Sequence, residues 1–286
     1  MKFLVLGSNG MAGHLIALYL QERGYDVTGF ARQKSGILQK SIVADASDFA
    51  SLKSIIEEGK FDVIINCIGL LNQFAENNKT DAILLNSWLP HFLADSAKKV
   101  GAYVIHMSTD CVFSGKNGNY TEADFPDGKS FYDRTKALGE LNDDANLTLR
   151  NSIVGPDIKK NGIGLLNWFM QQSSEVNGFT KAIWTGQTTL QLAKTMETAA
   201  KERPTGLVNA VPPFSINKYE LLKLFNKYIR KEKVKINPVE GWNIDKSLIR
   251  TNFNLQLQIP DYELMIAQLA DWIDQHKNLY PHYNLN

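Results

Sequence analysis

The sequence predicts an α/β protein in which a doubly wound parallel sheet is followed by a smaller C-terminal lobe. Short apolar runs alternate with stretches of helical period over residues 1–150. The runs are apolar throughout, which is typical of strands that helices cover on both faces. At ~150 residues per domain, the length of 286 residues suggests two units, which we place at 1–150 and 151–286.

Strands and helices alternate through the first unit. We expect strands at residues 3–6, 26–30, 42–43, 61–67, 103–107 and 147–150. The expected helices cover residues 11–23, 48–58, 80–100 and 131–143. Asp48 can cap the second helix, because an aspartate side chain accepts a hydrogen bond from a free amide at a helix start. Pro90 should interrupt the third helix, because proline lacks the amide that a helix interior needs.

The regular alternation weakens after Asn151. Helices are expected at residues 163–172, 188–201, 217–230 and 261–276, with Asn217 as the cap of the third. We interpret this part mostly as a smaller lobe that faces a substrate. The boundary between the units is soft, because residues 184–210 can fold back onto the sheet.

Composition excludes several classes of protein. The 31 Lys and Arg residues nearly balance the 30 Asp and Glu residues, so the basic excess typical of nucleic-acid binding is absent. The basic run Lys227–Lys235 fits a solvated helix end, where cations suit the helix dipole. No apolar stretch reaches the ~7–15 residues of a signal peptide or the ~20 of a membrane helix. We expect a soluble, cytoplasmic protein that binds neither nucleic acid nor membrane.

Cysteine and histidine usage gives no sign of a disulfide framework or a metal site. The two cysteines, Cys67 and Cys111, are too few for a framework. Neither they nor the five histidines stand at metal-ligand spacing, so we assign no metal ligands.

The first strand leads into a glycine-rich loop with the pattern Gly-x-x-Gly-x-x-Gly at residues 7–13. Missing side chains let the backbone approach a pyrophosphate, and the amides at the following helix start point toward it. This position favours a dinucleotide in a Rossmann fold. The expected contacts from the loop are Gly7, Ser8, Asn9, Gly10 and Met11.

The ends of the next strands bear on which dinucleotide binds. An acidic residue after the second strand would favour NAD, but the sequence has Arg32, which can pair with the 2′-phosphate of NADP or simply lie on the surface. We therefore expect NADPH, with NADH as the alternative. Asp45, followed by Ala46, can bond the adenine edge or serve a turn. Cys67-Ile68-Gly69 ends the fourth strand, where small residues let a ribose lie against the backbone, although Cys67 can equally be packing.

Tyr132 and Lys136 stand four residues apart, so they share one face of the expected helix. A free tyrosine titrates near 10, too high for efficient proton exchange at neutral pH. A unit charge ~4 Å away at an effective dielectric of ~20 contributes about 4 kcal/mol. That is at most about three pKa units, enough to bring the pKa of Tyr132 near neutrality. Lys136 can also bond a ribose hydroxyl of the cofactor.

Ser108-Thr109-Asp110 lies at the end of the expected strand 103–107, where ligands bind in this architecture. The hydroxyl of Thr109 could bond both the Tyr132 oxygen and a substrate carbonyl. Because Thr109 is expected at the same edge of the sheet, the Tyr-x-x-x-Lys pair is better explained by catalysis than by a chance spacing on a helix surface.

Three stretches together resemble the extended short-chain dehydrogenase/reductases, and most closely the dTDP-4-dehydrorhamnose reductase group, which reduces a 4-keto sugar nucleotide. They are the glycine loop, Ser108 to Gly115, and Tyr132 to Glu140. The resemblance is specific over residues 1–155 and looser beyond. It implies a catalytic triad of Thr109, Tyr132 and Lys136. It also places Asp110 and Val112 at the substrate, Asn151 near the nicotinamide and Ser108 among the cofactor contacts.

The sequence departs from that group at two positions. Asp133 stands where glycine is usual, and Cys111 where an aromatic residue is common. In the second half, Trp184 could stack on a sugar face or belong to the core. Lys181 or Arg250 could bind the pyrophosphate of a sugar nucleotide, or be solvated surface charges.

These features predict NADPH-dependent reduction of a 4-keto group on a nucleotide-linked deoxyhexose, as in the synthesis of cell-surface polysaccharide sugars. One alternative is a sugar-nucleotide epimerase or dehydratase that holds NAD tightly. Another is a regulatory subunit that binds dinucleotide without catalysis. The exact sugar, a magnesium requirement and the oligomeric state, with a homodimer among the options, stay open.

Overall fold

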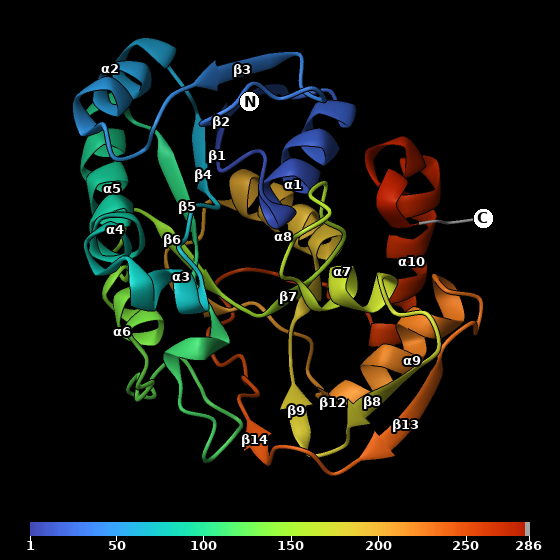
Figure 1. The fold of residues 1–286 in the computed structure, drawn as a ribbon. Coiled ribbons are helices and arrows are strands. Elements are labelled where there is room, and N and C mark those ends of the chain that lie inside the picture. Colours follow the sequence, from blue (N-terminus) through green and yellow to red (C-terminus); the bar gives the residue numbers. More distant parts are fainter. Residues whose placement is uncertain (284–286) are drawn as a thin grey trace.

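The computed structural model describes residues 1–283 and centres on a seven-stranded parallel sheet (Figure 1). The sheet order is β11-β6-β5-β4-β1-β2-β3. The strands in that order are β11 (Gly206–Asn209), β6 (Leu147–Arg150), β5 (Tyr103–Met107), β4 (Val63–Asn66), β1 (Lys2–Leu6), β2 (Asp26–Ala31) and β3 (Lys40–Val43). The predicted doubly wound α/β fold is confirmed.

Helices cover both faces of this sheet (Figure 1). On one face lie α1 (Met11–Glu22) and α8 (Thr189–Glu202); on the other lie α2 (Phe49–Gly59), α5 (Leu89–Val100) and α6 (Phe131–Leu138). Alternate strand residues supply two separate apolar cores, so that Val5 packs toward α1 while Leu6 packs toward α5. Because α8 and β11 come late in the chain, the second half of the sequence contributes both a strand and a helix to the main layers.

The helix expected over residues 80–100 has a different interior. It consists of α4 (Lys79–Ala82), a π-helical segment Ile83–Trp88 and α5, and it is preceded by α3 (Asn72–Asn77). The expected interruption at Pro90 is wrong, because this proline lies in the first turn of α5, where a missing amide is tolerated. The irregularity lies just before it, in the π turn.

The helix expected over residues 131–143 is shorter than predicted. It ends at Leu138, and Gly139 caps it. A Cβ atom at Gly139 would lie 1.9 Å from the carbonyl oxygen of Asn86, so only glycine lets the end of α6 pack against the π turn.

Three small sheets and three helices form the C-terminal lobe. The sheets are β10-β7, β12-β9-β14 and β13-β8. Their strands are β7 (Ile153–Val154), β8 (Glu175–Phe179), β9 (Ala182–Trp184), β10 (Gln187–Thr188), β12 (Ile216–Asn217), β13 (Lys235–Val239) and β14 (Ile244–Asp245). The helices are α7 (Leu165–Met170), α9 (Lys218–Tyr228) and α10 (Tyr262–Gln275).

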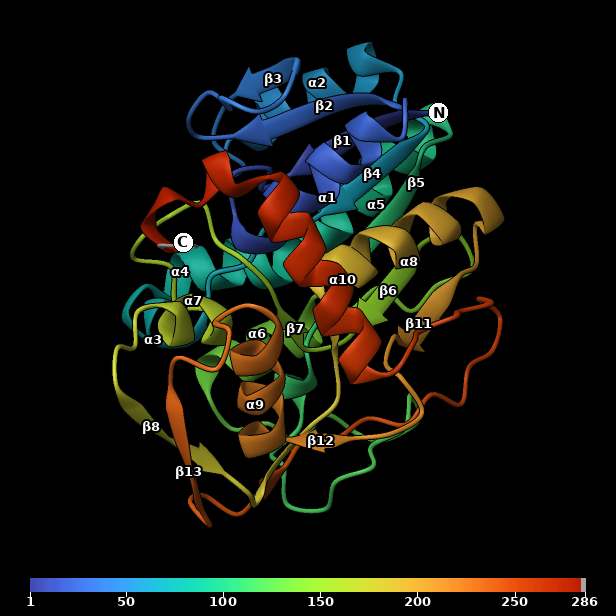
Figure 2. The ribbon, with the colours of Figure 1, turned by 90° about the vertical axis from the view of Figure 1, so that its right-hand side faces the viewer.

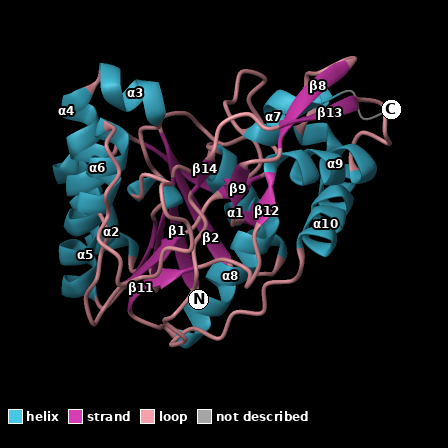
Figure 3. Cartoon of the chain, turned by 90° about the horizontal axis from the view of Figure 1, so that it is seen from below, coloured by secondary structure: helices cyan, strands magenta, loops and turns pink. Residues whose placement is uncertain are grey.

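The C-terminal helices connect this lobe to the main sheet. Helix α10 packs against both α8 and α9 (Figure 2). Seen from below, α9, α10, β8 and β13 gather on the side of the molecule away from α5 and α6 (Figure 3). Within residues 1–283, no helix has both the length and the apolar character needed to cross a membrane.

Candidate functional site

The glycine-rich loop joins β1 to α1 at the carboxyl edge of the sheet. Gly7 has φ +77°, a left-handed conformation that favours glycine, and its carbonyl accepts a hydrogen bond from the Gly10 amide at 2.8 Å. A Cβ atom at Gly13 would lie 2.2 Å from the carbonyl oxygen of Gly7. The loop is therefore a close backbone turn that leads into a helix N-terminus, which is the geometry that accepts an anion.

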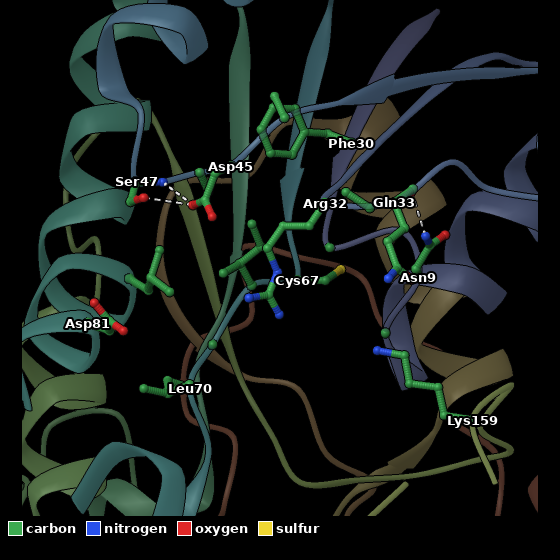
Figure 4. Close-up of a pocket in the computed structure, with 18 residues that line it drawn as sticks. Asn9, Phe30, Arg32, Gln33, Asp45, Ser47, Cys67, Leu70, Asp81 and Lys159 are labelled. Atoms are coloured by element: carbon green, nitrogen blue, oxygen red, sulfur yellow. Dashed lines mark hydrogen bonds between the residues drawn. The ribbon is translucent and has the colours of Figure 1, made fainter. Parts of the chain in front are cut away.

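A cavity of about 440 Å³ opens beside this loop (Figure 4). Nine of the expected cofactor residues line it: Gly7, Asn9, Gly10, Arg32, Asp45, Ala46, Cys67, Ile68 and Gly69. The lining also includes Leu70, Asp81, Leu85 and Lys159, to which no sequence pattern pointed. The cavity thus runs along the carboxyl ends of β1, β2, β3 and β4.

The polar groups of the cavity are arranged by short-range contacts. Oδ1 of Asp45 accepts hydrogen bonds from the amide and hydroxyl of Ser47 at 2.9 and 2.7 Å (Figure 4). These bonds lower the pKa of Asp45, and the charge of Arg32 adds to the effect. The Asn9 side chain donates to the Gln33 carbonyl at 2.8 Å, which ties the glycine loop to the end of β2. Asp45 is therefore an ionised acceptor, as bonding to an adenine amino group requires.

Five expected cofactor residues lie outside this cavity lining: Ser8, Met11, Ser108, Lys136 and Asn151. Ser8 is fully buried, and its hydroxyl lies beside Gly29 with no hydrogen-bond partner among the described residues. Met11 packs beneath Gly164. The hydroxyl of Ser108 donates to Oε1 of Glu140 at 2.6 Å, which makes it part of a structural network with Arg150.

The Asn151 side chain is also buried, and both of its amide atoms lack a hydrogen-bond partner among the described residues. A buried amide without partners is costly, and such a group in a native fold indicates a missing ligand or water. Asn151 directly follows β6, at the same sheet edge as the cavity.

Helix α6 carries Tyr132 and Lys136 on one face, as predicted from their spacing. Its start is fixed by a capping box: the Ser130 hydroxyl accepts from the Asp133 amide, and the Asp133 carboxylate accepts from the Ser130 amide, both at 3.0 Å. This bond pattern gives a physical role to Asp133 at the position where the resembled group has glycine.

The electrostatics of Tyr132 differ from the expectation. Burial raises its pKa, the neighbouring Cys111 thiol adds to the rise, and the Thr109 hydroxyl acts in the opposite direction. The expected lowering toward neutrality is wrong for this structure, because the phenol is only 6% exposed and Lys136 directs its charge elsewhere. Tyr132 packs with Ala75 and Ala82, beneath the segment that contains α3.

Lys136 donates to the carbonyl oxygen of Met107 at 2.7 Å and lies 3.4 Å from Nε2 of His106. Burial lowers the pKa of Lys136 to about 8, against the opposing charge of Glu140. The ring of His106 also contacts the Asn66 amide at 3.1 Å, which links Lys136 to the end of β4. Lys136 therefore holds the ends of β5 and β4 in register beside the cavity.

Thr109 and Asp110 begin a short 3₁₀ turn after β5. The Thr109 hydroxyl accepts from the Cys111 amide at 3.1 Å and donates to Oδ1 of Asp110 at 3.2 Å. Burial raises the pKa of Asp110. The Thr109 hydroxyl can therefore donate to a substrate carbonyl only if it first gives up its hydrogen bond to Asp110.

Most of the side chains that were expected to contact the substrate are buried or paired with other residues. Val112 is fully buried among Phe113 and Leu248, so its side chain cannot touch a substrate. Trp184 is 3% exposed and packs against Tyr262, which leaves no open face for a sugar. Lys181 pairs with Glu240 at the surface.

The surroundings of Arg250 are compatible with its expected role, which is to bind the pyrophosphate of a sugar nucleotide. Its guanidinium lies 5.1 Å from the ring centre of Phe253, and its Nη1 is buried with no partner among the described residues. An unpaired buried donor is available to an anionic ligand.

Two lysines that sequence reasoning missed face Asp110. Lys246 and Lys218 both act to lower the pKa of this carboxyl, against burial. Each follows a strand residue that pairs with Ile183 of β9, one on β14 and one on β12. The Lys218 ammonium lies 5.1 Å above the Trp184 ring. The only sequence signal near Lys218 was the predicted helix cap at Asn217. No sequence signal pointed to Lys246.

The arrangement fits a dinucleotide. The glycine turn would not tolerate a Cβ atom at Gly13, the cavity offers donors and an acceptor, and the Asn151 amide lacks partners. Over residues 1–283, no group of three or more His, Cys, Asp or Glu side chains is placed to hold a metal ion.

Comparison with known proteins agrees with this geometry. Residues 1–241 match the model of the RmlD substrate binding domain. The chain belongs to the RmlD substrate binding domain family. The RmlD family contains NAD(P)-dependent sugar-nucleotide reductases.

Individual relatives of the RmlD family differ in what they do. The chain is 33% identical over 141 residues to a dTDP-4-dehydrorhamnose reductase of Streptomyces griseus, covering 49% of this chain and 43% of that one. It is 29% identical over 166 residues to methionine adenosyltransferase 2 subunit beta of Xenopus tropicalis, covering 56% and 48%. The matches thus span less than half the length of either relative.

The fold extends over nearly the whole chain. A dTDP-4-dehydrorhamnose reductase of Bacillus anthracis, solved in complex with NADP, superposes with a TM-score of 0.79 at 21% identity, covering 96% of this chain and 100% of that one. The likeness therefore includes the C-terminal lobe as well as the main sheet.

Proposed function

We propose that this chain reduces a keto group of a nucleotide-linked sugar with NADPH. The observation that carries the proposal is the placement of three groups at one edge of the sheet, along which the cavity runs. Tyr132 and Lys136 share a face of α6, Lys136 bonds the Met107 carbonyl at the end of β5, and the unpartnered Asn151 amide follows β6. In a doubly wound sheet, ligands bind at this edge.

The chain's residues would divide the work as follows. The bound nicotinamide supplies a hydride. Tyr132 donates its phenolic proton to the carbonyl oxygen, and a raised pKa keeps that proton in place until the oxygen becomes basic. Lys136 orients the ribose while anchored on Met107, and Asn151 offers its amide to the nicotinamide. The rest is positioning and charge stabilisation.

The substrate side favours an anionic ligand. Lys218, Lys246 and Arg250 all come from the C-terminal lobe, and the first two lie around the buried Asp110 carboxyl. Cations suit the phosphates of a sugar nucleotide, because they form charge-assisted hydrogen bonds with phosphate oxygens. The keto group of a 4-keto deoxyhexose would then lie between Thr109 and Tyr132.

The test is consumption of NADPH with a panel of 4-keto sugar nucleotides, followed by the configuration of the product. Tyr132→Phe should lower turnover by about 10²–10⁴-fold, because a general acid contributes that much. Its NADPH affinity should stay within about twofold of wild type. Tyr120→Phe, in which the lost hydroxyl only accepts a bond from the Asn117 amide, is the matched control.

Other outcomes would redirect the proposal. Tightly bound NAD in the purified protein, with no net oxidation of NADPH, would favour the epimerase or dehydratase alternative. A Tyr132→Phe variant with wild-type turnover would remove the role assigned to this phenol.

A second candidate is a subunit that binds dinucleotide and accompanies another enzyme. It is favoured by the burial of Tyr132 beneath the α3 segment and by the likeness to subunits of methionine adenosyltransferase. Stable co-purification with a partner enzyme, together with no activity on any keto sugar, would support it over reduction.

A further inference from the structure

A loop from the C-terminal half of the chain reaches the dinucleotide cavity. This loop, residues 155–164, connects β7 to α7, and its Lys159 lines the cavity together with Asn9 and Gly10 (Figure 4). In the same view, Lys159 lies on the side of Asn9 and Gln33, across the cavity from Asp81 and Leu70.

The loop is held in place on both sides of Lys159. The Asp157 amide donates to the Tyr283 hydroxyl at 2.8 Å, and the Asp157 carboxylate accepts from the Lys159 amide at 2.8 Å. The Asn167 side chain donates to the carbonyl oxygens of Lys160 and Gly162 at 3.1 and 2.7 Å. The backbone of Lys159 is thus fixed, and its side chain enters the cavity from a built support.

The loop also touches the glycine-rich turn directly. A Cβ atom at Gly164 would lie 2.7 Å from the sulfur of Met11, the first residue of α1. The two segments are therefore in close contact although they are far apart in the sequence. A ligand group bound at the start of α1 lies within reach of the loop.

The two cations of the cavity have different surroundings. The charge of Arg32 acts on the Asp45 carboxylate, beyond the end of β2. The Lys159 ammonium has no hydrogen-bond or ion-pair partner within residues 1–283, and it lies on the side of the loop amides. A helix N-terminus attracts an anion, and an adjacent ammonium strengthens that attraction.

We propose that Lys159 binds the pyrophosphate of the dinucleotide, so that a loop of the C-terminal half completes the cofactor site. The inference rests on the proposed dinucleotide cofactor. Arg32 then serves the 2′-phosphate and Lys159 the pyrophosphate, which both NADPH and NADH possess.

The experiment measures the dissociation constants of NADPH and NADH by nicotinamide fluorescence, without substrate. Lys159→Met should weaken both cofactors by about tenfold, the equivalent of one charge-assisted contact, and leave their ratio unchanged. Affinity for adenosine 2′-monophosphate, which has no pyrophosphate, should not change. Lys160→Met is the matched control, because that side chain lines a different cavity, formed with residues 229–233.

The outcomes separate this inference from the function on which it rests. If Lys159→Met weakens only NADPH, or weakens neither cofactor, the pyrophosphate assignment is wrong while the reductase proposal stands. If the wild-type protein binds neither dinucleotide, both fall.

Discussion

The two ends of the candidate site are built in opposite ways. At the adenosine end, Arg32, Asp45 and Lys159 line an open cavity of about 440 Å³. At the catalytic end, Thr109, Asp110, Tyr132 and Lys136 are buried. Thr109 bonds Asp110, Tyr132 packs with Ala75 and Ala82, and Lys136 bonds the Met107 carbonyl. The adenosine end is thus a cavity that is already formed. The catalytic end is a packed polar network, whose hydrogen bonds must be broken before its side chains can bond a substrate.

The difference follows from what covers each end. Glycines and small residues form the cavity floor. Over the catalytic helix lies α3, whose Glu76 accepts a hydrogen bond from the Phe131 amide at 2.7 Å, next to Tyr132. We infer that dinucleotide binding needs little rearrangement, while a keto sugar must displace or reorganise this cover. The comparison can be tested by perturbing each end separately.

The largest effect is expected at the support of the catalytic end. Arg150 is buried and pairs with Glu140 at 2.6 Å. Removing one partner of a buried pair costs about 3–5 kcal/mol, because it leaves an uncompensated charge. Glu140→Ala should lower the free energy of unfolding in urea by that amount and abolish most turnover.

A surface pair gives the control for that measurement. Glu263→Ala removes the exposed partner of Lys227 and should cost less than about 1 kcal/mol. If Glu140→Ala is no more destabilising than this control, the network at the catalytic end does not support the site as described.

The next effect concerns the cavity end. Arg32→Ala should raise the dissociation constant of NADPH by about tenfold and leave that of NADH nearly unchanged, because only the 2′-phosphate loses a contact. Fluorescence titration with both cofactors measures this. Lys34→Ala, an exposed neighbour outside the cavity, is the control. An equal loss for both cofactors would contradict the assignment of Arg32.

A smaller effect is expected at the start of α6. Asp133→Gly removes one half of the capping box and should cost about 1 kcal/mol of unfolding free energy. It should also lower turnover severalfold, since Tyr132 lies in the first turn. Asp48→Ala removes the N-cap of α2 and should also cost about 1 kcal/mol, but without the loss of turnover.

The smallest expected effect is a pH dependence of NADPH affinity that arises from Lys136. Burial lowers the pKa of Lys136 to about 8, so its ammonium is lost as pH rises through that value, whereas a free lysine stays charged to about 10.4. NADPH affinity should therefore fall a few-fold between pH 7 and pH 9. Lys136→Met should bind more weakly and show no such slope; a slope that persists in this variant would assign it to another group.

Local chemistry explains why these features could be predicted from the sequence. Apolar runs, the Asp48 and Asn217 caps and the glycine loop each depend on a few adjacent residues, and the structure has them at those places. The residues that line the cavity lie at strand ends, whose positions follow from the strand pattern.

Other features depend on contacts that a single sequence does not display. The burial of Val112 and Trp184 arises from segments distant in the chain. Lys218 reaches the site from the start of α9, Lys246 from the end of β14 and Lys159 from a loop. The shift of the Tyr132 pKa was expected in the wrong direction, because a distance argument for Lys136 took no account of desolvation or of the Met107 carbonyl.

Because of the π-helical segment Ile83–Trp88, the geometry of the site depends on the number of residues in this segment. Its Asn86 binds both the amide and the carbonyl of Leu70, at 2.7 and 2.9 Å, and donates to the Thr135 hydroxyl at 3.1 Å. A π turn holds one more residue than an α turn, so deletion of a single neighbour such as Leu84 would restore a regular helix while rotating Asn86 away from both partners. A shortened segment would then disturb both the cavity rim and the catalytic helix, although every side chain that contacts a ligand remained in the sequence.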